Sequence, residues 1–193
     1  MLLVVDNGSI YTKQLTDFLN KKKIFFEKYT PYLLELNSLK KYDSIILSGR
    51  RRNDKKINAI NSKIINFSIK NNKKLLGICY GAEILALTLG GTIRKIESVQ
   101  KGDEKIEILQ DNFIVNNSLN VFESHGYEIS KLPDMLIPIG KSNNCKYEII
   151  QHKEKPIFGT QFHPEMSLDG NDLIEHFCSL WLILITLKIS LFY

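Results

Sequence analysis

The chain has 193 residues and a formal net charge of +5, with 44% hydrophobic and 24% charged residues. This length suits one domain with a full core, and the composition excludes a disordered chain, a collagen-like repeat and a coiled coil. Three cysteines are too few for a disulfide framework, which indicates a reducing compartment. The N-terminal apolar run lacks the length and basic flank of a signal peptide, so we expect a cytoplasmic protein.

The positive charge does not by itself predict a nucleic-acid site. Of the 26 basic residues only Arg50, Arg51, Arg52 and Arg94 are arginine, and the rest are lysine. Aromatic residues do not alternate with the basic ones, as they would along a groove that stacks bases. We therefore expect a solvated basic surface and no specific nucleic-acid binding.

In the first half of the chain, short apolar runs alternate with helical patterns. Apolar spacing predicts amphipathic helices over residues 11–19, with Ser9 as a possible N-cap, and over 57–67. Strands are predicted over four apolar or β-rich segments: 2–6, 24–29, 43–48 and 75–78. Strands that alternate with helices predict βαβ units around a mainly parallel sheet.

The second half has a different pattern. Residues 92–110 and 113–130 alternate like strands with no helix between them, and two further strands are predicted over 145–151 and 156–162. A helix is predicted over 168–180. The expected fold is therefore α/β: a mainly parallel central sheet flanked by helices, with an antiparallel β excursion in the second half. We expect residues 1–180 to form one domain.

The last residues form an apolar tail. From residue 177 to 193 the only charge is Lys188. This run is slightly shorter than the roughly 20 residues of a membrane helix, and apolar runs of this length are more often part of a core. A final core element, a weak membrane anchor and a non-native end stay open for residues 181–193, and we do not expect membrane association.

The segment from Gly77 to Gly81 carries the clearest chemical pattern. It reads Gly-x-Cys-x-Gly between an apolar strand and a helical pattern, which is the sulfur counterpart of the Gly-x-Ser-x-Gly nucleophile elbow. Glycines allow the tight turn, and the nucleophile is held in a strained, exposed conformation. A helix N-terminus favours thiolate, so the pattern predicts a lowered pKa for Cys79. A structural cysteine at a strand end is the simpler alternative.

A cysteine nucleophile needs a base near it in space. His163, followed by Pro and Glu165 at the end of a predicted strand, is the best candidate, with Glu165 orienting the imidazole. His152 precedes a charged loop and His176 lies on a surface-like helix. His125 fits the wall of a substrate site better than the role of base.

Together these pieces resemble the class I (triad) glutamine amidotransferase family over residues 1–180. They fall in family order and comprise the strand 2–6, Ile46-Leu47-Ser48-Gly49, the elbow, Ser124-His125-Gly126 and Gln161-Phe162-His163-Pro164-Glu165. Within the family, the Cys-Tyr-Gly elbow and the helix end 89–91 are most similar to the amidotransferase part of GMP synthases. Anthranilate and aminodeoxychorismate synthase subunits usually carry Cys-Leu-Gly-His-Gln instead.

The resemblance implies that Cys79 attacks the side-chain amide of glutamine, with His163 and Glu165 completing a triad. It also implies a set of oxyanion and substrate-binding residues: Gly49, Arg50, Tyr80, Glu83, Ser124, His125 and Gly126. Ammonia would pass to a separate ATP-pyrophosphatase subunit that converts XMP to GMP, in a heterodimer. The chain itself would need no metal or organic cofactor, with ATP and magnesium bound by the partner.

Three positions depart from the family pattern. Arg50 stands where the family has a second glycine, and we expect it to distort the turn or to need a positive φ. Glu83 replaces a glutamine that touches the substrate, so it would attract the α-ammonium and repel the α-carboxylate. Tyr127 replaces a common aspartate. A different synthetase partner, a non-catalytic regulatory protein and a γ-glutamyl hydrolase therefore remain alternatives.

Overall fold

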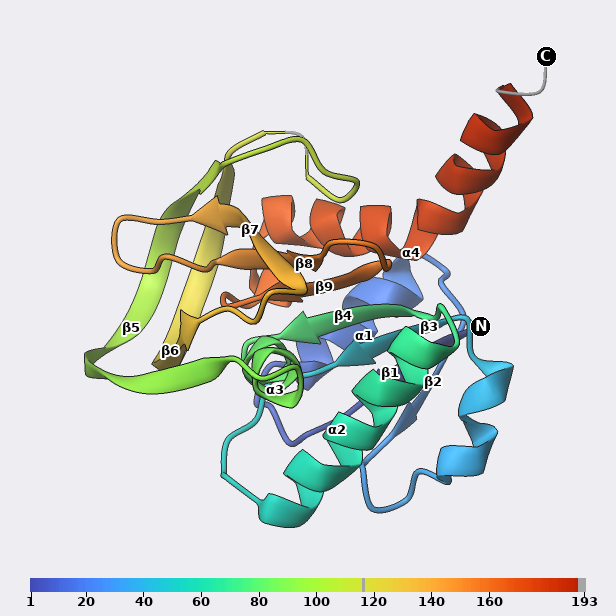
Figure 1. Cartoon of the computed structure of the whole chain (residues 1–193), viewed down its shortest axis with the longest axis horizontal. Helices are drawn as coiled ribbons and strands as arrows, with labels where there is room; N and C mark the ends of the chain where they lie inside the picture. The colour runs from blue at the N-terminus through green and yellow to red at the C-terminus, as the bar shows by residue number, and fades with distance from the viewer. Residues whose placement is uncertain (116, 191–193) are drawn as a thin grey trace.

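The computed structural model describes residues 1–115 and 117–190, with side chains described only as far as residue 180. A nine-stranded sheet runs through the molecule in the order β2-β1-β3-β4-β9-β8-β7-β5-β6 (Figure 1). Its strands are β1 (Leu2–Val5), β2 (Phe26–Tyr29), β3 (Ser44–Leu47), β4 (Lys74–Ile78), β5 (Thr92–Ile108), β6 (Leu119–Lys131), β7 (Leu136–Lys141), β8 (Ile149–His152) and β9 (Ile157–Thr160). The helices are α1 (Thr12–Lys21), α2 (Lys55–Lys70), α3 (Tyr80–Thr88) and α4 (Leu168–Ser190), with 3₁₀ turns at Leu36–Lys41 and Pro164–Met166.

The sheet has a parallel and an antiparallel part. Strands β2, β1, β3, β4 and β9 pair in parallel, whereas β8, β7, β5 and β6 continue the sheet with antiparallel pairs. This arrangement confirms the predicted fold class. The long hairpin of β5 and β6 reaches away from the parallel part (Figure 1).

Helices cover both faces of the parallel strands. On one face, Leu15 of α1 and Phe177 of α4 pack in a core with Val4 and Phe158. On the other face, Ile64 of α2 and Leu85 of α3 belong to a second core. Because both faces are covered, β1, β3, β4 and β9 are buried at every residue, which explains why their sequences are continuous apolar runs.

Some predicted boundaries were wrong. Strand β7 was not predicted, and residues 113–118 form no strand where the structure describes them. Helix α1 begins at Thr12 after Tyr11, and no side chain caps it. The Ser9 hydroxyl instead accepts a hydrogen bond from the Tyr11 N–H. In such turns a serine side chain can bond a nearby backbone N–H in place of the N–H groups at the start of a helix.

The C-terminal helix is longer than predicted. It continues to Ser190, so residues 181–190 of the apolar tail are helical, whereas residues 191–193 lie outside the described residues. Among the helices that the structure describes, none has the length and apolar character needed to cross a membrane.

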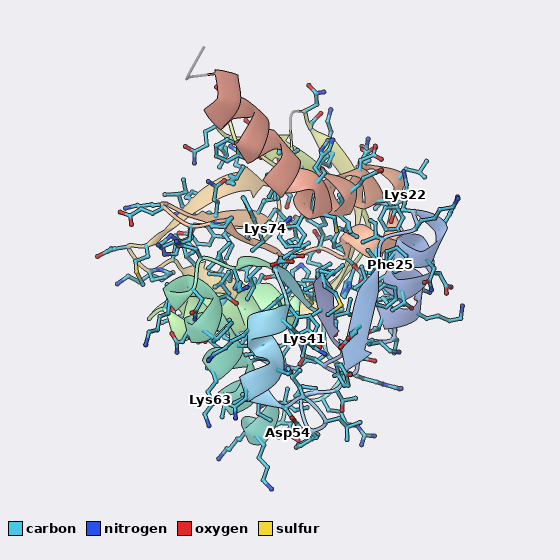
Figure 2. The ribbon with its side chains drawn as sticks, turned by 90° about the vertical axis from the view of Figure 1, so that its right-hand side faces the viewer. Lys22, Phe25, Lys41, Asp54, Lys63 and Lys74 are labelled. Carbon is cyan, nitrogen blue, oxygen red and sulfur yellow. The ribbon has the colours of Figure 1, made fainter. Side chains whose placement is uncertain are left out.

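A buried lysine joins the sheet to α4. Lys74 at the start of β4 is 1% exposed, and its Nζ donates to the carbonyls of Phe177 (3.1 Å) and Cys178 (2.9 Å). Figure 2 labels Lys74 in the interior below α4, and Lys63 at the surface. Burial lowers the pKa of Lys74 to about 8. The two carbonyls hold the ammonium in place but do not offset its loss of hydration.

The turn between β4 and α3 has no space for side chains at its glycines. A Cβ on Gly77 would lie 2.4 Å from the backbone of Gly81, and a Cβ on Gly81 would lie 2.4 Å from the carbonyl oxygen of Leu47. The start of α3 therefore rests directly on β3 and β4. This close packing fixes the position of Cys79 between them.

We predict that Lys74 makes stability increase with pH. Between pH 8 and about 10.5 the unfolded lysine keeps a proton that the folded one has lost, so the free energy of unfolding rises across this window. Below pH 8 the lysine is charged in both states and the cost of its burial remains. Urea unfolding at pH 8 and pH 10 should show a smaller rise for Lys74→Met than for wild type. An identical rise in both would contradict this prediction, and Lys63→Met, at an exposed position, is the control.

We also predict that Gly77→Ala destabilises the protein by about 2–4 kcal/mol, because its methyl group collides with backbone that cannot move without opening the turn. Gly126→Ala is the matched control. Its Cβ would meet only Val99, at 3.7 Å, so its cost should stay below about 1 kcal/mol. Urea midpoints at constant m-value would measure both, and equal midpoints would contradict the account of the turn.

Candidate active site

The candidate nucleophile lies where two neighbouring parallel strands end. Cys79 follows β4 directly, and its N–H donates to the carbonyl of Thr160 at the end of β9 (2.7 Å). Its φ is 51°, which places it with Lys23 and Asn72 as the positive-φ non-glycine residues of the described chain. Such a backbone is costly for a residue with a side chain. The strained elbow predicted from the glycine pattern is therefore present, but the predicted exposure of the nucleophile was wrong, because Cys79 is buried at 7% exposure.

The candidate base follows the neighbouring strand. His163 comes three residues after β9, and its Nδ1 lies 2.9 Å from Oε1 of Glu165. Both side chains are almost fully buried, at 4% and 1% exposure. A carboxylate at Nδ1 places the proton on that nitrogen and leaves Nε2 as the basic one. The structure thus forms the His–Glu pair that the sequence predicted.

The sequence did not reveal what fixes this histidine. The Tyr11 ring packs edge-on against the His163 ring with centroids 4.5 Å apart, and the Tyr11 hydroxyl bonds that of Ser124 (3.2 Å). A Cβ on Gly49 would lie 2.9 Å from Cε1 of His163. Gly49 is therefore needed because the imidazole lies against it. Tyr11 lay within a helical pattern, and nothing in that pattern pointed to the site.

A cavity of about 250 Å³ opens at Cys79. It brings together residues from the elbow, the loop after β3 and strand β6. The lining residues are Arg50, Arg51, Arg52, Asn53, Cys79, Tyr80, Glu83, Ser124, His125, Gly126 and Tyr127. All the predicted oxyanion and substrate residues line it except Gly49, which lies against His163.

Arg50 corrects one expectation. It does not have a positive φ, and its guanidinium carbon lies 3.9 Å from the centre of the Tyr80 ring. Its Nη1 donates to Asn53 (2.9 Å) and Asn58 (2.8 Å), and the Tyr80 hydroxyl donates to the same oxygen of Asn58 (2.8 Å). The arginine thus attaches the loop after β3 to α2 and α3.

Glu83 is buried on the first turn of α3, at 5% exposure. The amide of Gln161 reaches it at 3.4 Å. Burial raises the pKa of Glu83, while Gln161 and the charge of Arg50 act in the opposite direction. A carboxylate at the cavity wall is suited to an ammonium group.

The predicted low pKa of Cys79 is not what the structure indicates. Burial raises the pKa of this thiol well above its usual value, and the negative charges of Glu83, Glu165 and Glu123 raise it further. The backbone N–H of Tyr80 opposes them but does not outweigh them. Full burial and three acids exceed the effect of one helix end. Cys79 is therefore a thiol at neutral pH until a base takes its proton.

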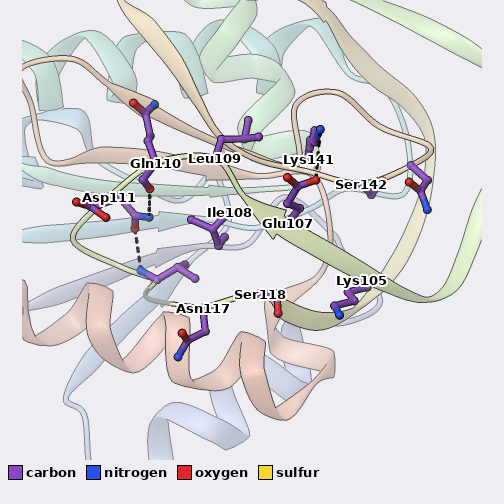
Figure 3. Close-up of a pocket in the computed structure, with 13 residues that line it drawn as sticks. Lys105, Glu107, Ile108, Leu109, Gln110, Asp111, Asn117, Ser118, Lys141 and Ser142 are labelled. Atoms are coloured by element: carbon purple, nitrogen blue, oxygen red, sulfur yellow. Dashed lines mark hydrogen bonds and ion pairs between the residues drawn. The ribbon is translucent and has the colours of Figure 1, made fainter.

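A larger cavity than the one at Cys79 lies elsewhere. It measures about 900 Å³ and is lined by β5, β7 and the segment after β5 (Figure 3). Lys141 and Glu107 form an ion pair of 3.3 Å at its edge. It shares no residue with the cavity at Cys79 and contains no cysteine or histidine. In the described part of the chain no cluster of His, Cys, Asp and Glu could hold a metal ion.

We predict that Glu83→Gln lowers the pKa of Cys79, because it removes a negative charge that disfavours the thiolate. Alkylation of Cys79 by iodoacetamide at pH 8, followed by mass spectrometry, should become about three- to tenfold faster. Glu154→Gln, in the exposed loop after β8, should leave the rate unchanged. Equal rates in wild type and Glu83→Gln would contradict this account of the thiol.

Sequence comparisons agree with the geometry. The family model for glutamine amidotransferase class-I matches residues 3–179. The chain is 30% identical over 186 residues to a glutamine-hydrolyzing GMP synthase subunit of Methanocaldococcus jannaschii, covering 92% of this chain and 96% of that protein. It is 32% identical over 186 residues to the protein of the same name from Methanococcus aeolicus, with the same coverage.

Solved structures give the same result. A putative GMP synthase subunit protein from Thermoplasma acidophilum superposes with a TM-score of 0.84 at 26% identity, covering 97% of this chain and 96% of that one. A glutamine amidotransferase from Thermotoga maritima shares the fold, with a TM-score of 0.74 at 20% identity over 97% of this chain and 84% of that one. With the match over residues 3–179, the chain belongs to the class-I glutamine amidotransferase family.

Proposed function

We propose that this protein is the glutaminase subunit of a two-chain GMP synthase. It hydrolyses glutamine to glutamate and ammonia, and a separate synthetase subunit uses the ammonia to convert XMP to GMP. The observation that carries the glutaminase proposal is the buried His163–Glu165 pair, which follows β9, the strand next to β4 and the strained Cys79. The relatives named as GMP synthase subunits, which the chain matches over almost their whole length, support the acceptor.

The first step is attack of the Cys79 sulfur on the side-chain amide carbon of glutamine. His163 takes the thiol proton at Nε2 and returns it to the leaving nitrogen, so that ammonia departs and a thioester remains. Glu165 stabilises the imidazolium that forms between these events. Because burial raises the pKa of Cys79, the thiolate forms only as the proton is transferred.

We assign stabilisation of the oxyanion to two backbone N–H groups. The N–H of Tyr80 points at the Cys79 sulfur and belongs to the first turn of α3, where N–H groups have no helical partner. The turn at Gly49 and Arg50 supplies the second donor, on the loop that the Arg50–Tyr80 contact holds. Fixed donors at a developing negative charge are worth about a hundredfold or more in rate.

Water then attacks the thioester, with His163 as the base, and glutamate leaves with Cys79 restored. The substrate's amino-acid end lies among Glu83, Ser124, His125 and Gly126, where the carboxylate of Glu83 receives the α-ammonium. No step needs a metal or an organic cofactor in this chain. ATP and magnesium belong to the synthetase subunit.

The second candidate function is a glutaminase subunit that serves another synthetase, because the site that releases ammonia does not contact the molecule that accepts it. The changes at Arg50, Glu83 and Tyr127 would suit a non-catalytic protein, but Arg50 ties its loop in place without strain. That contact favours a working oxyanion turn. The glutaminase is therefore the function that the site supports best.

We predict that Cys79→Ala lowers glutamate release by about a thousandfold or more, because no other group replaces the nucleophile. His163→Gln should have a similar effect, and Cys178→Ala, outside the cavity, should retain activity. The assay measures glutamate from glutamine with this chain by itself and with an ATP-pyrophosphatase partner, XMP and ATP, since partners often gate such sites. An active Cys79→Ala variant, or a wild type inactive with its partner, would contradict the proposal.

The acceptor is tested in the same mixture. GMP should form from XMP with glutamine as the nitrogen source, and Cys79→Ala should form it only from added ammonium. If glutamate is released but XMP is not aminated by any such partner, the glutaminase stands and the proposed acceptor is wrong.

A further inference from the structure

A buried acid pair behind the cavity has no role in the proposed hydrolysis. Glu123 on β6 is 3% exposed, and Glu148, just before β8, is 1% exposed. Among the described residues, both carboxyl oxygens of Glu123 and Oε2 of Glu148 are buried without a well-aligned hydrogen bond, and so is Nε2 of His125, which lies 3.1 Å from Oε2 of Glu123. The charge of Glu123 and a hydrogen bond with it both raise the pKa of Glu148. Buried acceptors without donors are costly, so a proton belongs between them.

The surroundings of the two carboxyl groups indicate which acid holds that proton. Two adjacent buried carboxyls cannot both ionise, and burial, followed by the charge of Glu123, raises the pKa of Glu148. Glu104 on β5 also faces Glu148 and acts in the same direction, whereas the Ser142 hydroxyl opposes it. Glu123 has an imidazole neighbour instead: its Oε2 lies 3.1 Å from Nε2 of His125. Glu148 therefore donates its proton to Glu123.

His125 connects this pair to the cavity. Its Nδ1 lies 2.8 Å from the carbonyl oxygen of Tyr127, and a carbonyl only accepts, so Nδ1 carries a hydrogen. Nε2 faces the carboxylate of Glu123. Burial alone would lower the pKa of His125, but the hydrogen bond and charge of Glu123, with a smaller contribution from Glu83, raise it.

Several other polar and charged groups surround this cavity. Glu83 on α3 faces His125 and His163, and Gln100 is opposite His125 on β5. The guanidinium of Arg50 is already held by Asn53, Asn58 and the Tyr80 ring, whereas Arg51 and Arg52 line the cavity from exposed positions on the loop after β3. His125 is the buried group at the wall beside Glu83 that can carry a positive charge.

We propose that a protonated Glu148 keeps Glu123 ionised, and that Glu123 in turn holds His125 as an imidazolium that attracts the α-carboxylate of glutamine. Nδ1 bonds the carbonyl of Tyr127 and Nε2 faces Glu123, so His125 acts through its charge and not through a direct hydrogen bond. Glu123 and Glu148 are positioning residues. The binding half of this proposal rests on the proposed glutaminase function, whereas the charge of His125 does not.

The charge of His125 is tested first, by NMR titration of histidine-labelled full-length protein without partner or substrate. In Glu123→Gln the pKa of His125 should fall by about one unit or more, because the carboxylate that favours the imidazolium is gone. Glu123→Asp should restore part of the shift. Glu128→Gln is the matched control, since Glu128 is similarly buried on the same strand but pairs with Arg94. An unchanged titration in folded Glu123→Gln overturns the proposal.

The position of the shared proton is tested by Glu148→Gln. Glutamine imitates the protonated acid and also donates to Glu123, so the titration of His125 should stay as in wild type. A fall in its pKa would mean that Glu148 carries negative charge, which overturns the proposed order. This variant also keeps the proposal falsifiable if Glu123→Gln does not fold.

Substrate binding is tested with the partner-activated enzyme. In wild type, KM for glutamine should rise as the pH passes the pKa of His125, since the charge is lost above it. In Glu123→Gln this rise should move to lower pH, and KM near pH 7 should increase about three- to tenfold. A shifted NMR titration with an unshifted KM profile overturns the binding half. Absence of any glutamine hydrolysis in wild type would instead contradict the proposed function, with the NMR result unaffected.

Discussion

The contact between the first turn of α3 and the ends of β3 and β4 determines how the rest of the site is built. Gly81 rests on the carbonyl of Leu47, and Gly77 rests on Gly81, with no space for a Cβ at either position. Cys79, between them, is forced to a φ of 51°. Because β9 is the next strand, the N–H of Cys79 bonds Thr160, and the chain that leaves β9 delivers His163 to the same edge. A packing constraint between backbones thus sets where the chemistry occurs.

This architecture has an electrostatic cost. The site contains several buried carboxyl groups, and those of Glu83, Glu165 and Glu123 all raise the pKa of Cys79. Elsewhere such a thiol would be inert. Here Glu165 is paired with His163, the proposed base on the segment that leaves β9, and the negative charge that disfavours free thiolate favours the imidazolium. The same arrangement limits reactivity in the absence of substrate.

Features that depend on residues close together in the sequence were predicted, and features that depend on distant residues were not. The parallel strands were predictable because two-sided burial leaves continuous apolar runs, and the elbow because tight turns require glycine at fixed spacing. Strand β7, with Pro138 at its centre, was missed because its pattern is irregular and its pairing with β5 and β8 is long-range. Tyr11 and the Glu123–Glu148 pair were missed for the same reason: their partners are more than twenty residues away. The pKa of Cys79 was wrongly predicted because a helix terminus is visible in sequence, whereas complete burial is not.

Arg50 shows how one structural requirement can be met by different residues. The resemblance led us to expect a second glycine after Gly49, and a long charged side chain there indicated a damaged turn. The backbone needs no positive φ at this position, so the side chain is free to act elsewhere. It covers the ring of Tyr80 and shares Asn58 with the Tyr80 hydroxyl, and Asn61 continues the polar contacts to Asn7 beside Ser48. Because Tyr80 also supplies the backbone N–H at the sulfur, this set of contacts fixes the two proposed oxyanion donors relative to each other. Arg50, although it departs from the family pattern, therefore keeps the turn after Gly49 in place beside Tyr80.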